Sequence, residues 1–124
     1  MSDDEIGYTE YRNDKLPERS NLPAFPVETC VSLIGRKWKL LIMRDLLLNG
    51  SMRFKALQRS IGGVSQKVLT TNLRNMEDAG LIVRRVYAEV PPRVEYSLTE
   101  LGQSLRPIID SMWAWGESYQ ALAK

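Results

Sequence analysis

The chain has 124 residues, of which 44% are hydrophobic and 26% are charged, the proportions of an ordinary globular domain. It contains no histidine and one cysteine, Cys30, which argues against most hydrolytic and metal chemistry and rules out an internal disulfide. No apolar run reaches the roughly 18 residues of a membrane span, and the acidic N-terminus lacks the apolar stretch of a signal peptide. We therefore expect a cytoplasmic protein that is not an enzyme and that uses neither a metal nor a cofactor.

The charges are unevenly distributed along the chain, although the formal net charge is only +2. Residues 1–22 contain six acidic and three basic side chains, whereas residues 35–93 contain twelve basic and four acidic ones. A basic block of this kind attracts a polyanion such as nucleic acid. A merely solvated surface would have the same composition, so charge alone does not decide between these interpretations.

Residues 1–22 have few apolar positions and neither a helical nor a strand period. We interpret them as a flexible acidic arm, which Tyr8, Tyr11 and Leu16 could anchor on the body or on a partner chain. The folded domain would then occupy residues 23–124. Its first helix is expected to start at Pro26, because proline suits the first helical position, and to end at Gly35.

Residues 38–48 are apolar nearly all round, which predicts a central buried helix. Asn49 and Gly50 end this helix. Residues 51–53 are long enough only for a brief extended bridge to the next element.

Residues 54–80 predict two helices joined by a short glycine turn, the pattern of a helix-turn-helix. Ser65 is suited to cap the second helix, and Gly80 is suited to end it in the left-handed conformation. One face of this helix is apolar, and the opposite face carries polar side chains with no acid before Glu77. Such a helix can pack on a core and lie in a major groove, although most helices of this type are ordinary solvated surface helices. The predicted major-groove residues are Ser65, Gln66, Lys67, Thr70, Thr71 and Arg74.

After the second helix the pattern changes to strands over residues 81–89 and 93–98, with Val90-Pro91-Pro92 between them. A two-stranded hairpin directly behind a recognition helix is a wing. The predicted fold class is therefore mainly α with a small β-hairpin, a winged helix-turn-helix. We expect Arg93 to reach a minor groove from the wing tip. The residues predicted to contact the DNA backbone or to act from the wing are Arg53, Lys55, Arg84, Arg85 and Arg93.

The last helix should open at Thr99, and its apolar residues follow a heptad-like seam to Leu122. Pro107 predicts a kink or a late start. The seam is wide, so we expect the terminal helices to form a homodimer interface; the alternative is that this helix folds back on the first two helices of its own chain. The predicted interface residues are Val27, Val31, Leu105, Ile108, Met112, Trp115 and Tyr119.

Several segments together carry a family resemblance: LIGRKWKLLIM (33–43), MRFKAL (52–57), GGVSQKVLTTNLRNMEDAGLIVRRVY (62–87), VPPRVEYSLTELG (90–102) and WAWGE (113–117). In this order they resemble the HxlR-type winged helix-turn-helix regulators of bacteria, relatives of the MarR group. The resemblance implies a cytoplasmic, dimeric, double-stranded-DNA-binding transcription factor, most often a repressor. Two equivalent recognition helices imply an inverted-repeat operator, and a small-molecule effector or a stress signal is left open. The alternative function is a winged-helix module that binds protein or RNA without operator recognition.

One position departs from the pattern of the redox-sensing family members, which carry a cysteine directly before a proline at the head of the first helix. Here that site reads Phe25-Pro26, and Cys30 lies about one turn further on. Cys30 is therefore either a small buried hydrophobe or, as the alternative, a thiol that senses oxidants.

Overall fold

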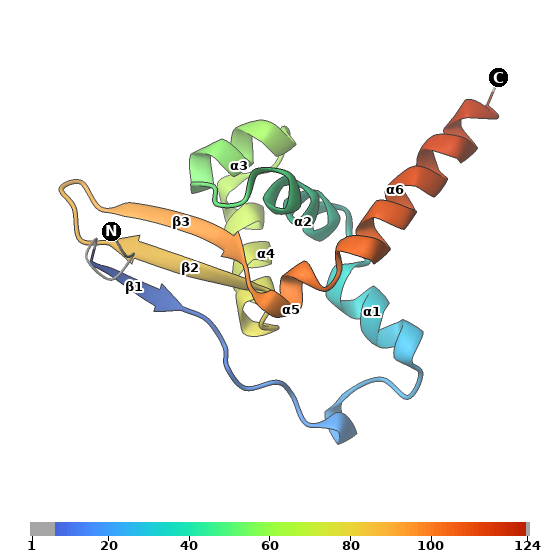
Figure 1. Cartoon of the computed structure of the whole chain (residues 1–124), viewed down its shortest axis with the longest axis horizontal. Coiled ribbons are helices and arrows are strands. Elements are labelled where there is room, and N and C mark those ends of the chain that lie inside the picture. Colours follow the sequence, from blue (N-terminus) through green and yellow to red (C-terminus); the bar gives the residue numbers. More distant parts are fainter. Residues whose placement is uncertain (1–6, 124) are drawn as a thin grey trace.

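A computed structural model describes residues 7–123 (Figure 1). The strands form a small antiparallel sheet, α2, α3 and α4 lie together near one end of it, and α6 projects away from the body (Figure 1). The elements are β1 (Tyr8–Tyr11), the short 3-10 helix η2 (Arg19–Asn21), α1 (Pro26–Ile34), α2 (Lys37–Asn49), α3 (Phe54–Ile61), α4 (Gln66–Asp78), β2 (Ile82–Tyr87), β3 (Arg93–Leu98), α5 (Glu100–Gln103) and α6 (Arg106–Ala121).

The core is centred on α2, as its nearly continuous apolar sequence predicts. Ile42, Met43 and Leu46 are completely buried, and α3 and α4 pack against this helix. The apolar face of α4 completes the core, because Leu69, Leu73 and Met76 are buried in the same cluster. These packed side chains fix the position of α4 through one face and leave the other face to solvent.

The helix-turn-helix is formed by α3 and α4. Gly62 and Gly63 between them have φ values of 72° and 73°, a region that L side chains rarely adopt. The brief extended bridge predicted before α3 is also present, because the Met52 amide donates to the Tyr96 carbonyl at 2.8 Å and the Tyr96 amide donates back at 2.7 Å. This bridge ties the start of the motif to the wing.

The sheet has three strands in the order β1-β2-β3, all antiparallel. The predicted hairpin forms from β2 and β3, and β1 adds a third strand in which Tyr8 pairs with Tyr87 and Tyr11 with Arg84. The prediction of a flexible arm is therefore wrong for residues 8–11. Four mostly exposed residues at a sheet edge carry no period of their own, because they are ordered by backbone bonds to a distant strand. The first six residues of the predicted arm lie outside the described residues.

The C-terminal helix starts late, as Pro107 predicts. Thr99 caps α5, its Oγ1 accepting a hydrogen bond from the Gly102 amide at 3.0 Å. The chain then turns before α6 begins at Arg106, so the expected continuous seam from residue 101 is interrupted. Proline has no amide hydrogen, and it is tolerated only in the first turn of a helix. None of the helices within residues 7–123 combines the length and apolar character that a membrane crossing requires.

Candidate nucleic-acid interface

The N-terminus of α4 is capped as predicted. The Ser65 hydroxyl accepts a hydrogen bond from the Val68 amide at 3.1 Å, which satisfies one of the amides that the first helical turn leaves without a partner. Ser65 itself is exposed, and its hydroxyl hydrogen can still donate to a ligand. The positive end of the helix dipole and these amides together suit an anion such as a phosphate.

The predicted reading face of α4 is open to solvent. Gln66, Lys67, Thr71 and Arg74 are exposed, and Thr70 is half-buried beside the sheet. The Thr71 hydroxyl donates to the Lys67 carbonyl at 3.0 Å, so this side chain lies along the helix surface. A helix with one buried and one polar exposed face has the dimensions that a major groove admits.

Basic side chains also lie at the start of α3, the other helix of the helix-turn-helix. Arg53 immediately precedes α3 and Lys55 lies in its first turn, and both are exposed. Two further exposed residues were not among the predicted site residues, namely Arg59 on α3 and Asn75 on α4. Asn75 lies one helical turn after Thr71, so the spacing of α4 was the signal that would have found it.

The two neighbouring arginines of β2 point to opposite faces of the sheet. Arg84 faces α4, where its Nε lies 3.7 Å from Glu77 Oε2 and its guanidinium lies over the Tyr11 ring. Arg85 is on the other face and donates to Glu10 Oε1 at 2.8 Å. Successive strand residues alternate between faces, so the structure brings only Arg84 to the side of the recognition helix.

Arg93 at the start of β3 is held by acidic and aromatic neighbours. Its terminal nitrogens lie 3.1 Å from Glu89 and 3.8 Å from Glu95, and the guanidinium lies 3.8 Å from the centre of the Tyr87 ring. The side chain is only 24% exposed. A contact of Arg93 with a minor groove therefore requires these ion pairs to open.

A polar cavity of about 280 Å³ lies between α4 and the wing, beside the contact of α4 with β2. It is lined by residues of both elements, including Thr70, Arg74, Glu77, Arg84 and Tyr96. Burial raises the pKa of the Glu77 carboxyl, and the nearby Arg84 charge partly opposes this shift. The negative charge of the Glu77 carboxylate offsets the positive charge of Arg84. Arg74 is the exposed basic residue of this cavity.

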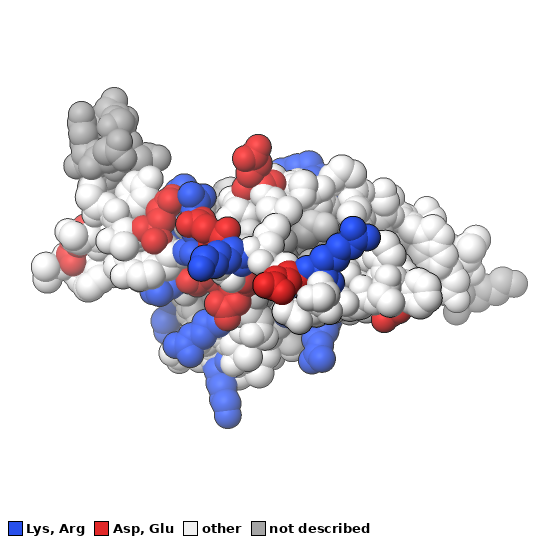
Figure 2. All heavy atoms as spheres, turned by 90° about the horizontal axis from the view of Figure 1, so that it is seen from below, with Lys and Arg blue, Asp and Glu red and all other residues white. Residues whose placement is uncertain are grey.

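The predicted interface residues on α1 and α6 are exposed and apolar. We call these residues together the α1–α6 surface. Trp115 is 68% exposed, and its ring stacks on Tyr119 at 5.2 Å between centroids. On the face shown in Figure 2, the end of the molecule that carries α6 has few charged side chains. The remaining exposed members are Val27, Val31, Ile108 and Met112.

Two predicted residues lie elsewhere. Leu105 packs against the core of its own chain, and α6 is anchored there by the buried side chain of Ile109. Cys30 is a free thiol that also packs against the core. Within residues 7–123, no group of three or more acidic or cysteine side chains is arranged to hold a metal ion.

The fold and the exposed polar face of α4 define a winged helix-turn-helix protein. The sequence model of the family described as HxlR-like helix-turn-helix matches residues 33–124. The chain belongs to this family of transcriptional regulators.

Two relatives illustrate the similarity. An uncharacterized HTH-type transcriptional regulator of Methanothermobacter thermautotrophicus is 45% identical over 113 residues, covering 91% of this chain and 84% of the relative. The redox regulator HypR in its oxidized form is 44% identical, with a TM-score of 0.72 over 76% of this chain and 96% of that structure. Its reduced form gives a TM-score of 0.74 at 43% identity, covering 77% and 94% of the two chains.

Proposed function

We propose that the protein is a homodimeric repressor that reads an inverted-repeat operator in double-stranded DNA with α4. The observation that carries this proposal is the division of α4 into a buried apolar face and an exposed polar face that carries no acid before Glu77. Burial of one face fixes the helix, so the other face is presented in a defined orientation.

The side chains of the motif suit different parts of a duplex. Gln66 can hydrogen-bond an adenine edge, and Lys67 or Arg74 can read guanine or hold a phosphate. Arg53 and Lys55 lie at the start of α3 and suit backbone phosphates. Arg93 would take part only after exchanging its acidic partners for a phosphate or a minor-groove edge.

Dimerisation through the α1–α6 surface would place two copies of α4 on one face of the duplex. Exposed apolar surface of this extent on a projecting helix favours a partner, and a second copy supplies one with matching chemistry. The half-sites would then lie about one helical turn, roughly 34 Å, apart. A regulator of this kind acts in the cytoplasm, where its DNA target lies.

The signal that controls the protein is proposed to be a small molecule. HypR is named as a redox regulator, but in this chain the one cysteine is half-buried against the core. A thiol in apolar surroundings is usually unreactive, which favours a packing role for Cys30.

Fluorescence anisotropy with the DNA upstream of its own gene, beside a scrambled duplex and a structured RNA, tests the function. We expect selective binding to the upstream duplex that weakens between two salt concentrations. Light scattering on the same sample should give the mass of a dimer. Equal weak binding to all three nucleic acids, or a monomer mass with the operator bound, would contradict the proposal.

A further inference from the structure

An apolar cavity lies at the C-terminal end of α4, and none of the roles above uses it. Its volume is about 540 Å³, within the range of small-molecule sites. The N-terminal segment is the stretch from Tyr8 to Leu22. Four parts of the chain form the walls of the cavity: residues 13–22 of this segment, α1, the end of α4, and α5. The apolar lining residues are Leu16, Pro17, Leu22, Leu33, Ala79 and Leu101.

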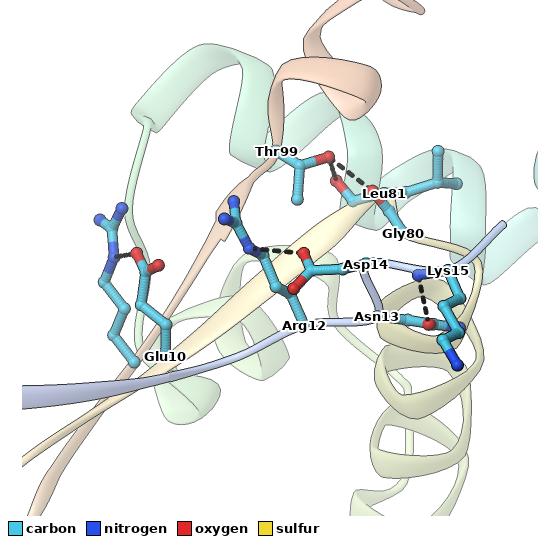
Figure 3. A network of polar contacts seen from close by, with 9 residues as sticks. Glu10, Arg12, Asn13, Asp14, Lys15, Gly80, Leu81 and Thr99 are labelled. Atoms are coloured by element: carbon cyan, nitrogen blue, oxygen red, sulfur yellow. Dashed lines mark hydrogen bonds and ion pairs between the residues drawn. The ribbon is translucent and has the colours of Figure 1, made fainter.

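The N-terminal segment is held against the end of α4 by a specific contact of Asn13, whose side chain also bonds within the segment to Lys15 (Figure 3). The Asn13 side-chain amide donates to the Asp78 carbonyl, and Asn13 Oδ1 accepts from the Lys15 amide at 3.0 Å. At Gly80 the backbone has a φ of 81°, which favours glycine, and a Cβ there would lie at an ordinary van der Waals distance of 3.4 Å from the Asn13 carbonyl oxygen. The segment therefore lies in contact with the end of the helix and forms one wall of the cavity.

The chemistry of the lining defines the occupant. Leu16, Leu22 and Leu101 remain substantially exposed although they face this cavity, so an apolar molecule would remove their surface from water. The charged lining residues, Lys15 and Asp78, have opposite signs and give no preference for a charged ligand.

Neutral polar groups in the lining come from Asn13 and Thr29. The Asn13 amide already bonds to Asp78, which leaves the Thr29 hydroxyl as the neutral group suited to one polar substituent. We infer that this cavity binds an uncharged, mainly apolar small molecule with one hydroxyl-type group.

Binding of a small molecule in this cavity would regulate DNA binding by α4. This regulatory role rests on the proposed function. The cavity joins α1, which carries Val27 and Val31 of the α1–α6 surface, to the C-terminal end of α4. A molecule that fits one relative placement of these helices better than another shifts the protein toward that placement. The separation of the two recognition helices in a dimer then changes, and with it the affinity for the operator.

The test uses the full chain, labelled with ¹⁵N, and 2-naphthol as the probe. Matched analogues of the same shape are 2-naphthoate and 2-naphthylmethylammonium, which carry opposite charges. We expect saturable amide shifts near Leu33, Ala79 and Leu101 with 2-naphthol, and weaker binding of both charged analogues. Shifts centred on α2 or α6, no saturable shift, or tighter binding of a charged analogue would overturn the proposal.

Variants locate the site. Leu16→Ser should weaken probe binding by about tenfold, because it removes apolar wall, and Leu22→Trp should fill the cavity and do the same. Leu48→Ser is the matched control, since Leu48 and Leu16 are each 62% exposed but Leu48 lies on α2. Equal weakening of probe binding by all three variants would overturn the assignment. So would amide shifts of the cavity residues on dilution of the protein without probe, because they would show that a second copy covers the site.

Anisotropy with the upstream duplex separates this inference from the function on which it rests. Saturating 2-naphthol should change the duplex Kd by about fivefold or more, and Leu22→Trp should abolish that change. If the duplex binds but the probe does not, the cavity inference fails while the function stands. If the probe binds without altering duplex affinity, the regulatory role is wrong. If the probe binds and no duplex does, the cavity stands and the function fails.

Discussion

The recognition helix and the N-terminal segment lie in contact but obtain their structure in different ways. α4 has a cap, an apolar face and a glycine stop within its own sequence. The segment from Tyr8 to Leu22 has none of these signals, and its order comes from β2 and from the end of α4. One element is specified locally, whereas the other is specified by its partners.

This difference has a functional side. The segment neutralises Arg85 through Glu10 and covers one side of Arg84 with Tyr11, so it takes part of the basic charge of the wing out of solution. α4 keeps Lys67 and Arg74 exposed. The contrast therefore concentrates the free positive charge of the motif on α3 and α4 rather than on the middle of the wing.

The largest effect on stability should come from the buried face of α4. Leu69 is fully buried in the core, so Leu69→Ala leaves a cavity and should lower the free energy of unfolding by about 2–5 kcal/mol. Urea denaturation followed by circular dichroism measures this loss. A cost below about 1 kcal/mol would show that α4 is not fixed by the core.

A smaller and more local effect is expected from the N-terminal strand. The double variant Tyr8→Ala with Tyr11→Ala removes the ring contacts to Tyr87 and to Arg84. It should cost about 1–2 kcal/mol, the sum of a few cross-strand pairs. Hydrogen exchange should show faster exchange of the β1 amides with the α4 amides unchanged. Faster exchange of the β1 and α4 amides together would contradict the claim that α4 is ordered by its own sequence and β1 by its partners.

The cap of α4 gives a third, still smaller effect. Ser65→Ala removes the acceptor for the Val68 amide and should cost about 1 kcal/mol, whereas Ser65→Gly should cost only a few tenths. Thermal unfolding of both variants checks the order. An equal cost for the two would mean that the hydroxyl contributes nothing to the helix start.

The smallest effect concerns pH. Burial raises the pKa of Glu77 above its ordinary value of 4.5, so the folded protein binds this proton more tightly than the unfolded chain. The contribution of Glu77 to stability is then most favourable below pH 4.5 and is lost as the pH rises through the folded-state pKa. Glu77→Gln should flatten the stability profile over that interval, and denaturation at several pH values measures it. An unchanged profile would contradict the shift.

Local chemistry explains how far the sequence predicts this fold. Ser65, Gly62 and Gly80 mark the ends of the helix-turn-helix, and Val90-Pro91-Pro92 marks the turn of the hairpin, because each signal acts within a few residues. β1 escaped prediction because its pairing joins residues more than 70 positions apart. No short pattern reports such a contact.

The candidate site divides in the same way. The exposure of the α4 face follows from helical spacing, so its residues were predictable. The partner of Arg85 was not, because Glu10 lies 75 positions away and becomes its neighbour only through the fold. Glu77 and Glu89 are close in sequence to Arg84 and Arg93, but the geometry of the helix end and of the hairpin decides that they pair. The apolar cavity also could not be foreseen, since it requires the N-terminal segment to cross the end of α4.

The most direct test of the account is the affinity of Arg74→Ala for the upstream duplex, measured by anisotropy beside Arg19→Ala. Both arginines are exposed, but Arg74 lies on the reading face and Arg19 on η2 in the N-terminal segment. We expect Arg74→Ala to cost about 1–3 kcal/mol of binding free energy and Arg19→Ala to leave the affinity unchanged. Equal affinities of the two variants and the parent chain would contradict the claim that α4 reads the DNA.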